Sequence, residues 1–298
     1  MKNAMPSISE PAWARRLLIA FAFLHVALLI MLPFASVIAQ ACADGLSTFR
    51  QVFRSSDTQH AIKLTLLIAL CAVPLNALLG ICLAWGVTHL KLPGKRLIMA
   101  ILDLPFSVSP VVVGFLFILL LGKNSPCGAW LENHGVKIIF AFPGLLLATL
   151  FVTMPFVAKE LIPLMQGHSR DEEDAARLLG ASWLRIFWKI TLPEIKWGLL
   201  YGVILCTARA MGEFGAVAVV SGNIRGRTNT LPLHVEALFQ DGELSSASAA
   251  ASLLALLGLI SLAARIITDI RKRKREDSAP TESLNQIKKH EHPNQRHL

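Results

Sequence analysis

Two opposite charges lie within one long apolar run of this sequence. Arg209 and Glu213 are four residues apart in the run Trp197–Val220. On a helix, this spacing places both side chains on one face, where they can pair. A charged side chain at the centre of a bilayer costs roughly 2.5–3.5 kcal/mol on insertion scales. Two hypotheses follow: the pair locks helices together, or it contacts a charged substrate inside the membrane.

Small and polar residues surround and follow this pair. Gly212 and Gly215 would allow the backbone to approach neighbouring helices closely. Beyond the run, Arg225 and Arg227 stand in a glycine-containing turn, where guanidinium and backbone N–H groups can guide a tetrahedral oxyanion or dock an acidic binding protein. If the pair contacts a substrate and is not a structural lock, the residues expected along the translocation path are Arg209, Gly212, Glu213, Gly215, Ser221, Gly222 and Asn223.

The polar segment from Lys159 to Lys196 has a helical pattern of its own. Four carboxylates, Asp171 to Asp174, begin a helical stretch, where they favour the positive end of the helix dipole. Gly180 follows as a helix cap or sharp turn. A second amphipathic helix is expected over 181–190, stopped by Pro193. The apolar residues of this elbow either need a partner surface or pack on the underside of the bundle; they are Leu178, Leu179, Trp183, Ile186, Phe187 and Ile190.

Sequence patterns typical of enzymes do not occur in this chain. It has no G-x-S-x-G elbow, no Walker A pattern and no cluster of His, Asp and Glu with metal spacing. We therefore predict no catalytic residue, no metal site and no cofactor bound by this chain. The five cysteines form no C-x-x-C pair. Cys42 and Cys127 are both expected on the outer side, where a disulfide between them is one possibility.

The composition is typical of a membrane protein. Of 298 residues, 54% are hydrophobic and only 16% are charged, whereas a soluble globular domain has about 25% charged residues. The apolar residues gather in runs of about 20, which match a bilayer core of about 30 Å. We therefore predict an all-α membrane protein with six transmembrane helices, over Leu17–Ala39, Leu64–Val87, Leu97–Leu121, Ile138–Ala158, Trp197–Val220 and Ala247–Ile267.

The distribution of Lys and Arg predicts the orientation. With the N-terminus inside, 21 of the 29 basic residues lie in inside segments and 7 in outside segments. This bias predicts a multi-pass protein with both termini in the cytoplasm. The same flanking positions account for the formal charge of +9, so we predict no nucleic-acid partner. The run Arg271–Arg275 is expected to flank the last span and touch membrane lipid, and the tail from Glu276 is expected to be disordered.

The segment between the fourth and fifth spans resembles the EAA loop of ABC-importer permeases. That motif reads Glu-Ala-Ala, three residues, Gly, nine residues, Ile-x-Leu-Pro, and the spacing fits here throughout. Asp174 stands where the motif has Glu, which keeps the charge but shortens its reach, and the neighbouring Glu173 could supply the longer side chain. The resemblance implies a type I ABC-importer permease fold whose cytoplasmic coupling helices dock on a separate ATPase. The implied coupling residues are Asp174, Ala175, Ala176, Gly180, Ile190, Leu192 and Pro193.

Other stretches resemble the sulfate and molybdate branch of these permeases, and more narrowly the sulfate/thiosulfate permeases. They are Leu104–Val112, Ala208–Gly226 and Thr230–Glu236. The resemblance implies import of sulfate or thiosulfate across a bacterial inner membrane, with molybdate or another tetrahedral oxyanion as the alternative. The partners it implies are a sister sulfate permease, two ATPase subunits that bind ATP and Mg, and a periplasmic sulfate- or thiosulfate-binding protein.

The resemblance also divides the chain. Residues 1–16 form a cytoplasmic segment and 17–59 the first span with its outer loop. Residues 60–267 form the permease domain, with the coupling loop over 171–193, and 268–298 form the basic tail. A membrane-embedded enzyme is disfavoured by the missing catalytic patterns, and a channel or simple interaction protein would leave the EAA-like spacing unexplained.

Overall fold

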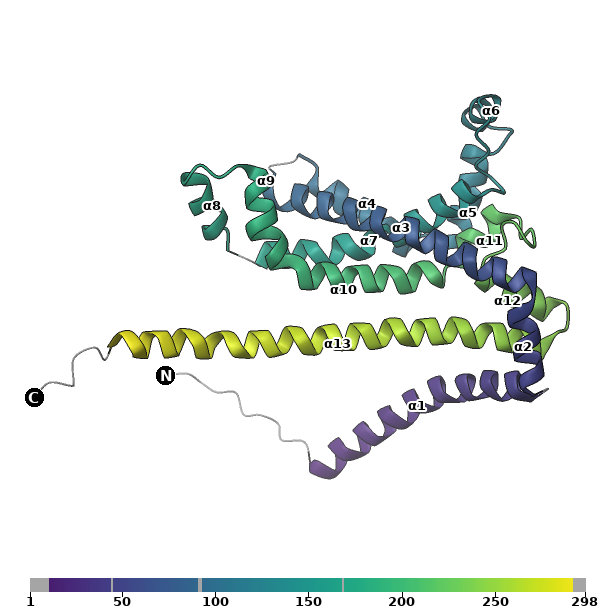
Figure 1. The fold of residues 1–298 in the computed structure, drawn as a ribbon, viewed down its shortest axis with the longest axis horizontal. Helices are drawn as coiled ribbons and strands as arrows, with labels where there is room; N and C mark the ends of the chain where they lie inside the picture. Colours follow the sequence, from purple (N-terminus) through teal and green to yellow (C-terminus); the bar gives the residue numbers. More distant parts are fainter. Residues whose placement is uncertain (1–10, 44, 91–92, 168, 292–298) are drawn as a thin grey trace, which may run out of the picture.

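The computed structural model describes residues 11–43, 45–90, 93–167 and 169–291, and within these ranges all regular structure is helical. Three long helices form the centre of the bundle: α3 (Ser56–His89), α7 (Phe142–Gly167) and α10 (Leu192–Met211). Figure 1 shows α13 (Leu244–Glu291) running beside α10, with α1 (Ala12–Ala43) packed on α13. The shorter helices α2 (Leu46–Arg54), α6 (Pro126–Asn133) and α12 (Leu231–Gln240) lie at the same end of the bundle, where α6 stands apart from the other two.

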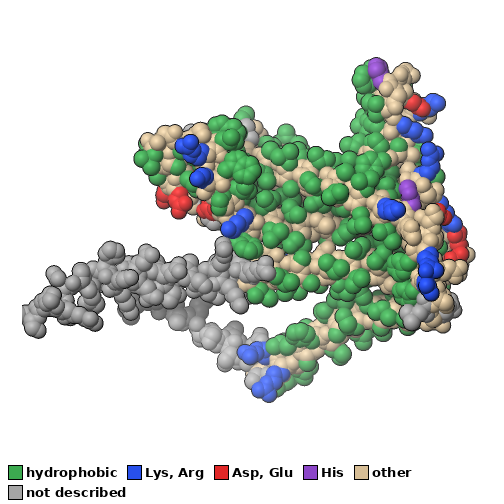
Figure 2. All heavy atoms as spheres, viewed as in Figure 1, with side chains coloured by type: hydrophobic (Ala, Val, Ile, Leu, Met, Phe, Trp, Pro, Cys, Tyr) green, Lys and Arg blue, Asp and Glu red, His purple; other side chains and the backbone are tan. Residues whose placement is uncertain are grey.

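The bundle has two chemically different ends. We call the end that carries α8 (Asp171–Leu178) and α9 (Trp183–Ile186) the inner end, and the end that carries α6 and α12 the outer end (Figure 1). Hydrophobic side chains cover much of the face between them, while charged side chains gather toward the ends (Figure 2). The beginning of α1 and the end of α13 both point toward the inner end. This distribution fits a bundle that lies across a membrane.

Five helices of the described part are long and apolar enough to span a membrane, or six if one bent pair counts as a single span. The predicted runs Leu17–Ala39, Leu64–Val87 and Ala247–Ile267 lie entirely on α1, α3 and α13. The run Ile138–Ala158 lies mostly on α7, which begins at Phe142 and continues to Gly167. The prediction of six transmembrane helices therefore agrees with the fold.

The third predicted span, Leu97–Leu121, is not one straight helix. It divides into α4 (Lys95–Ser107) and α5 (Pro110–Leu121), which meet at an angle of 109°. The cause is local, because the residue before a proline avoids the α conformation and Pro110 is well placed to begin a new helix. Val108 and Ser109 are accordingly extended.

The fifth predicted span, Trp197–Val220, is also interrupted. Helix α10 ends at Met211, and the seven-residue helix α11 (Gly215–Ser221) begins after a short break. Gly212 is a weak helix former, and the Glu213 carboxylate accepts the N–H of Ala216 at 3.0 Å, which caps the new helix. The prediction that Arg209 and Glu213 share one helix face is therefore wrong, because Glu213 lies in the break.

Small residues let the central helices approach closely. A Cβ atom on Gly80 of α3 would lie 2.7 Å from Val157 of α7, and one on Gly202 of α10 would lie 3.1 Å from the Cα of the same valine. Close approach of this kind replaces the hydrophobic driving force that helices lack in lipid. Around these contacts, Leu161, Ile195 and Cys206 are completely or almost completely buried. This core holds α7 rigidly between α3 and α10.

The backbone of the basic C-terminal tail is helical as far as Glu291, while the disorder expected from Glu276 stays a prediction. Helix α13 continues without interruption from the last span to Glu291. The tail is rich in Lys, Arg, Glu and Gln, which are good helix formers and can extend a helix that the span has already nucleated. The side chains of the predicted lipid-binding run Arg271–Arg275, and residues 1–10 of the predicted N-terminal segment, lie outside the described part of the chain.

Candidate functional site

The elbow predicted at Gly180 is present and has a defined geometry. Gly180 has a φ of +79° and follows the end of α8. Its N–H donates to the carbonyl of Arg177 at 2.9 Å, and the N–H of Ala181 donates to the carbonyl of Ala176 at 3.0 Å. These two bonds form a Schellman motif, which satisfies the last carbonyl groups of a helix and turns the chain. Gly180 therefore fixes the angle between α8 and the helix that follows.

The second half of the elbow differs from the prediction. Pro193 does not stop the helix that begins at Trp183, because α9, a π-helical turn over Phe187–Thr191 and α10 form one continuous rod. A proline clashes with the carbonyl four residues before it, and a wider π turn at this place relieves that clash. Ile190, Leu192 and Pro193 thus connect the elbow rigidly to the central helix α10.

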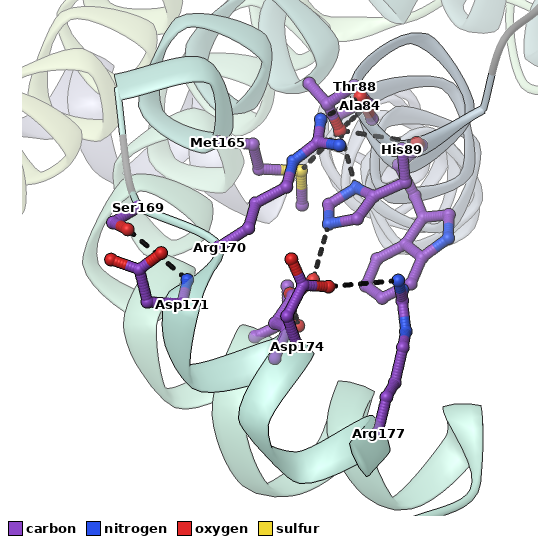
Figure 3. Close-up of polar contacts among 12 residues, drawn as sticks. Ala84, Thr88, His89, Met165, Ser169, Arg170, Asp171, Asp174 and Arg177 are labelled. Atoms are coloured by element: carbon purple, nitrogen blue, oxygen red, sulfur yellow. Dashed lines mark hydrogen bonds and ion pairs between the residues drawn. The ribbon is translucent and has the colours of Figure 1, made fainter.

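A buried polar cluster attaches α8 to the bundle (Figure 3). The Glu173 side chain turns inward, where one oxygen lies 3.0 Å from His89 Nε2 and the other accepts the Thr191 hydroxyl. The Arg170 guanidinium donates to the carbonyl of Thr88. Trp85 stacks on the His89 ring with centroids 4.1 Å apart. The cluster joins α8 to the inner end of α3 and to the rod that becomes α10.

The two neighbouring carboxylates therefore have different surroundings. Asp174 is exposed and pairs with Arg177 at 3.4 Å, one helical turn away (Figure 3). Glu173 is buried against His89, so its carboxylate faces the bundle, whereas that of Asp174 faces outward. Which of the two carboxylates serves the EAA-like motif stays a prediction. The sequence does not reveal the contribution of Thr88 and His89, since they lie more than 80 residues away and match no motif.

The apolar residues of the elbow divide into two groups. Ile186 is buried, and Phe187 packs edge-on against Trp85, so both belong to the underside of the bundle. Leu178 and Leu179 are 90% and 88% exposed, and Trp183 is exposed beside them. Ala175 and Asp174 complete this outward surface on α8, whereas Ala176 is only half-exposed. We call the exposed residues Asp174, Ala175, Leu178, Leu179 and Trp183 the elbow surface.

Replacing Gly180 with valine is expected to reduce transport about five- to thirtyfold, because a non-glycine residue in the left-handed region costs roughly 1–2 kcal/mol. A Cβ atom at this position would meet nothing within 4 Å, so the cause is backbone conformation and not crowding. Gly180→Asn is the matched control, since asparagine tolerates this region. Uptake measured in membrane vesicles should therefore rank wild type, Asn, then Val; equal uptake for Val and wild type would contradict the elbow's role.

The pairing predicted for Arg209 and Glu213 is confirmed, although Glu213 lies outside the helix. Arg209 Nη1 and Glu213 Oε2 are 2.5 Å apart, and the side chains are 34% and 1% exposed. Glu213 is held in place by its bond to the Ala216 N–H. The carboxylate is thus a fixed, buried partner, and the guanidinium is the partner that surroundings can reach.

The two interrupted spans meet beside this pair. A Cβ atom on Gly215 would lie 2.9 Å from Pro110 Cβ, so the beginning of α11 touches the beginning of α5. The predicted close approach therefore holds for Gly215. It does not hold for Gly212, which is exposed and whose added Cβ would meet only the carbonyl of Ala208 at 3.5 Å. Broken helices in a membrane mark positions where backbone groups face a cavity or a ligand.

The predicted path residues at the outer end form a hydrogen-bonded turn. Gly222 and Asn223 both have positive φ, and the Ser221 hydroxyl accepts the N–H of Asn223 at 3.0 Å. Asn229 donates to the side-chain oxygen of Asn223, and Thr228 donates to the Ser221 carbonyl. Ser221, Gly222 and Asn223 lie at the far end of the seven-residue α11, about 10 Å from the Arg209–Glu213 ion pair. The turn thus stands apart from Arg209 and Glu213.

No group of three or more His, Cys, Asp and Glu in the described ranges could hold a metal ion. Cys42 and Cys127 are separate, exposed thiols on α1 and α6. Arg225 pairs with Asp241 in the outer loops. The elbow surface at the inner end and the Arg209–Glu213 pair between the helix breaks are therefore the two candidate sites that the sequence also singled out.

Residues 76–276 match the protein family described as "Binding-protein-dependent transport system inner membrane component". The chain belongs to this family. It is 46% identical over 270 residues to the "Sulfate transport system permease protein CysW" of Escherichia coli (strain K12), covering 91% of this chain and 93% of that protein. It is 32% identical over 239 residues to the "Sulfate transport system permease protein CysT" of the same strain, covering 80% and 86%. The resemblance to sulfate permeases is thereby confirmed.

The fold agrees with a solved transporter. The chain matches a structure described as "a bacterial ABC transporter involved in the import of the acidic polysaccharide alginate" with a TM-score of 0.72 and 16% identity, covering 88% of this chain and 96% of that one. At this identity the likeness concerns the fold. The chain is thus an inner-membrane permease component with the type I importer fold.

Proposed function

We propose that this chain is the permease subunit of an ABC importer that moves sulfate, and also thiosulfate, across a bacterial inner membrane. The single observation that carries the proposal is the 46% identity over 91% of the chain to a sulfate permease. The motifs around Arg209, Glu213 and Pro110 fit the same substrate class. The relatives' names favour sulfate over the molybdate alternative.

The proposal includes partners for each surface. A sister permease is supported by the second, more distant sulfate permease of the same strain as the first relative. The chain has no Walker A pattern, so ATP and Mg would bind to separate ATPase subunits, two per complex. The family description supports a binding protein that delivers the anion at the outer end. Membrane lipid would cover the remaining apolar faces.

The coupling residues would have two tasks: to bind the ATPase, and to transmit its movement to the helices of the bundle. Leu178 and Leu179 of the elbow surface would enter a cleft on the ATPase, because large apolar side chains exposed to this degree need a partner. Movement of the elbow would then reach α10 through the continuous rod over Trp183–Met211. It would reach α3 through the Glu173–His89 contact. Nucleotide-driven motion would thus be transmitted to the helices that hold Arg209.

Growth of a deletion strain tests the substrate. A strain lacking this chain should fail to grow when sulfate or thiosulfate is the only sulfur source, and should grow normally on cysteine. Expressing the chain again in this strain should restore growth on sulfate and on thiosulfate. Normal growth of the deletion strain on sulfate, with loss of molybdate-dependent enzyme activity, would contradict the proposal and favour the molybdate alternative.

Both termini are expected in the cytoplasm, because 21 basic residues lie in the proposed inside segments and 7 in the outside segments. A reporter fused after Glu291 should be active only if it is a cytoplasmic reporter such as β-galactosidase. A periplasmic reporter at the same position should be inactive. The opposite pattern would contradict the proposed orientation.

A further inference from the structure

An ion pair between α4 and α7 is not used by the function proposed so far. Asp103 and Lys159 pair across these two helices, and the lysine Nζ also lies 4.6 Å from the centre of the Phe106 ring. In the sequence, Asp103 is an isolated carboxylate within a span and Lys159 stands at the edge of the coupling segment. Each lies eight residues from the inner end of its helix, a distance of about 12 Å at 1.5 Å per residue. Both residues therefore lie within helices that are apolar enough to count as membrane spans, and not at the inner ends of those helices.

The pair is partly open to its surroundings. The Asp103 and Lys159 side chains are 53% and 35% exposed. Charges exposed to lipid at this depth would cost about 2.5–3.5 kcal/mol each on insertion scales. Charged residues within membrane spans therefore face water, a substrate or another protein chain. The apolar ring of Phe106 is also exposed on α4, so the surface that carries the pair contains both charged and apolar groups.

A stripe along α7 connects this pair to the side of the bundle that holds α10. Phe156, Lys159, Glu160 and Pro163 are partly or fully exposed, while Val157 and Ala158 between them are buried. At 100° per residue, the four exposed positions lie on one face of the helix. Lys159 faces α4, where it pairs with Asp103. Glu160 makes an interaction of its own and faces α10, because a Cβ atom added to Gly202 would lie 3.5 Å from Glu160 Cβ. The stripe thus lies between α4 and α10.

Arg209 lies farther out along the same two helices. Cys206 of α10 and the carbonyl of Thr153 of α7 are in contact at 3.8 Å, which fixes the relative height of these antiparallel helices. Lys159 is six residues inward from that level and Arg209 is three residues outward. At 1.5 Å per residue, the two cations are separated by about 14 Å along the bundle. Each of the two cations has a carboxylate partner.

We infer that Lys159 is a second cation on the path of the transported oxyanion, inward of Arg209, and that Asp103 is its counter-ion when no anion is present. This inference rests on the proposed function in sulfate import. The ammonium group carries three N–H donors and can exchange a carboxylate for a sulfate oxygen without moving its stem. A cation that already has a partner binds a dianion weakly, which favours release into the cytoplasm. Phe106 holds the ammonium group in place through its ring face.

The test uses the complete importer reconstituted in proteoliposomes, with uptake of radiolabelled sulfate and ATP hydrolysis measured together. Lys159→Met should reduce uptake about tenfold or more, equivalent to at least 1.4 kcal/mol, while the complex assembles and still hydrolyses ATP. Lys159→Arg should keep most uptake because the charge remains. Lys63→Met removes an exposed lysine of α3 and should change neither quantity. Normal uptake by Lys159→Met would overturn the inference.

A charge swap separates a path residue from a structural brace. In Asp103→Lys/Lys159→Asp the pair persists, but the cation moves to α4. Assembly without recovery of uptake would support the inference, because the path then lacks its cation on α7. Recovery of both assembly and uptake, or failure of both this variant and Lys159→Met to assemble, would show that the pair only braces the helices and would overturn it. Failure of the unmodified importer to take up sulfate would instead contradict the proposed function.

Discussion

Replacing Leu178 and Leu179 together with aspartate is expected to abolish sulfate uptake, because the permease would no longer bind its ATPase. Both leucines are about nine-tenths exposed at the inner end of the bundle. Burial of a leucine side chain contributes roughly 1.5–3 kcal/mol, and a buried carboxylate in its place adds a desolvation cost. The combined loss predicts an affinity for the ATPase at least about a thousandfold weaker, by the tenfold change per 1.4 kcal/mol. The double variant should still insert in the membrane, since neither side chain packs on the bundle.

Co-purification of a tagged ATPase with the permease measures this loss directly. Glu172→Gln is the matched control, because Glu172 is exposed on the same helix but lies outside the elbow surface. The control should retain the ATPase, and the double aspartate variant should lose it. Full retention of the ATPase by the double variant would show that the elbow surface does not dock there.

The second large effect is expected at Arg209 and Glu213. Glu213→Gln keeps an oxygen that can accept the N–H of Ala216, so it removes the charge without removing the cap of α11. Arg209 would then be an unpaired guanidinium, which binds the dianion too strongly and releases it slowly. Uptake should fall about tenfold or more, for a change of at least 1.4 kcal/mol, while part of the ATP hydrolysis remains. Arg209→Lys should be milder than Arg209→Ala, because the charge is kept.

The competing hypothesis is a static brace, and the double variant decides between them. If the pair only holds helices together, Arg209→Ala and Glu213→Ala should each fail to assemble, and combining them should recover much of the loss. If the pair belongs to the path, the double variant should assemble but not transport. Glu213 is buried and Arg209 is partly exposed, so the guanidinium is the member of the pair that an anion can reach. Sulfate uptake close to that of the wild type in the double variant would contradict the hypothesis that the pair belongs to the path.

Local chemistry explains which parts of this fold follow from the sequence. The six apolar runs, the elbow at Gly180 and the proximity of Arg209 to Glu213 depend on residues close in the chain, so spacing predicts them. The 109° bend before Pro110 does not follow in the same way, because a proline in a membrane span often produces only a kink. The π turn that carries the helix through Pro193 is likewise visible only in the structure.

The sequence could not predict contacts between segments that lie far apart in the chain. The inward turn of Glu173 depends on His89, which lies 84 residues away, and no spacing rule connects them. Asp103 and Lys159 are separated by 56 residues. The sequence gives no reason to connect these two charges, and they meet only because α4 packs on α7. In both cases the bundle itself supplies the partner that decides whether a charged side chain is buried or exposed.

The most direct test of the central claim is transport by the reconstituted importer, formed by this chain, its sister permease, the ATPase and the binding protein. The quantity to measure is ATP-dependent accumulation of radiolabelled sulfate in proteoliposomes, with and without this chain. Accumulation should require this chain and ATP, should be inhibited by unlabelled sulfate or thiosulfate, and should be unaffected by an equal concentration of molybdate. Accumulation that is independent of this chain, or that molybdate inhibits more strongly than sulfate, would contradict the account.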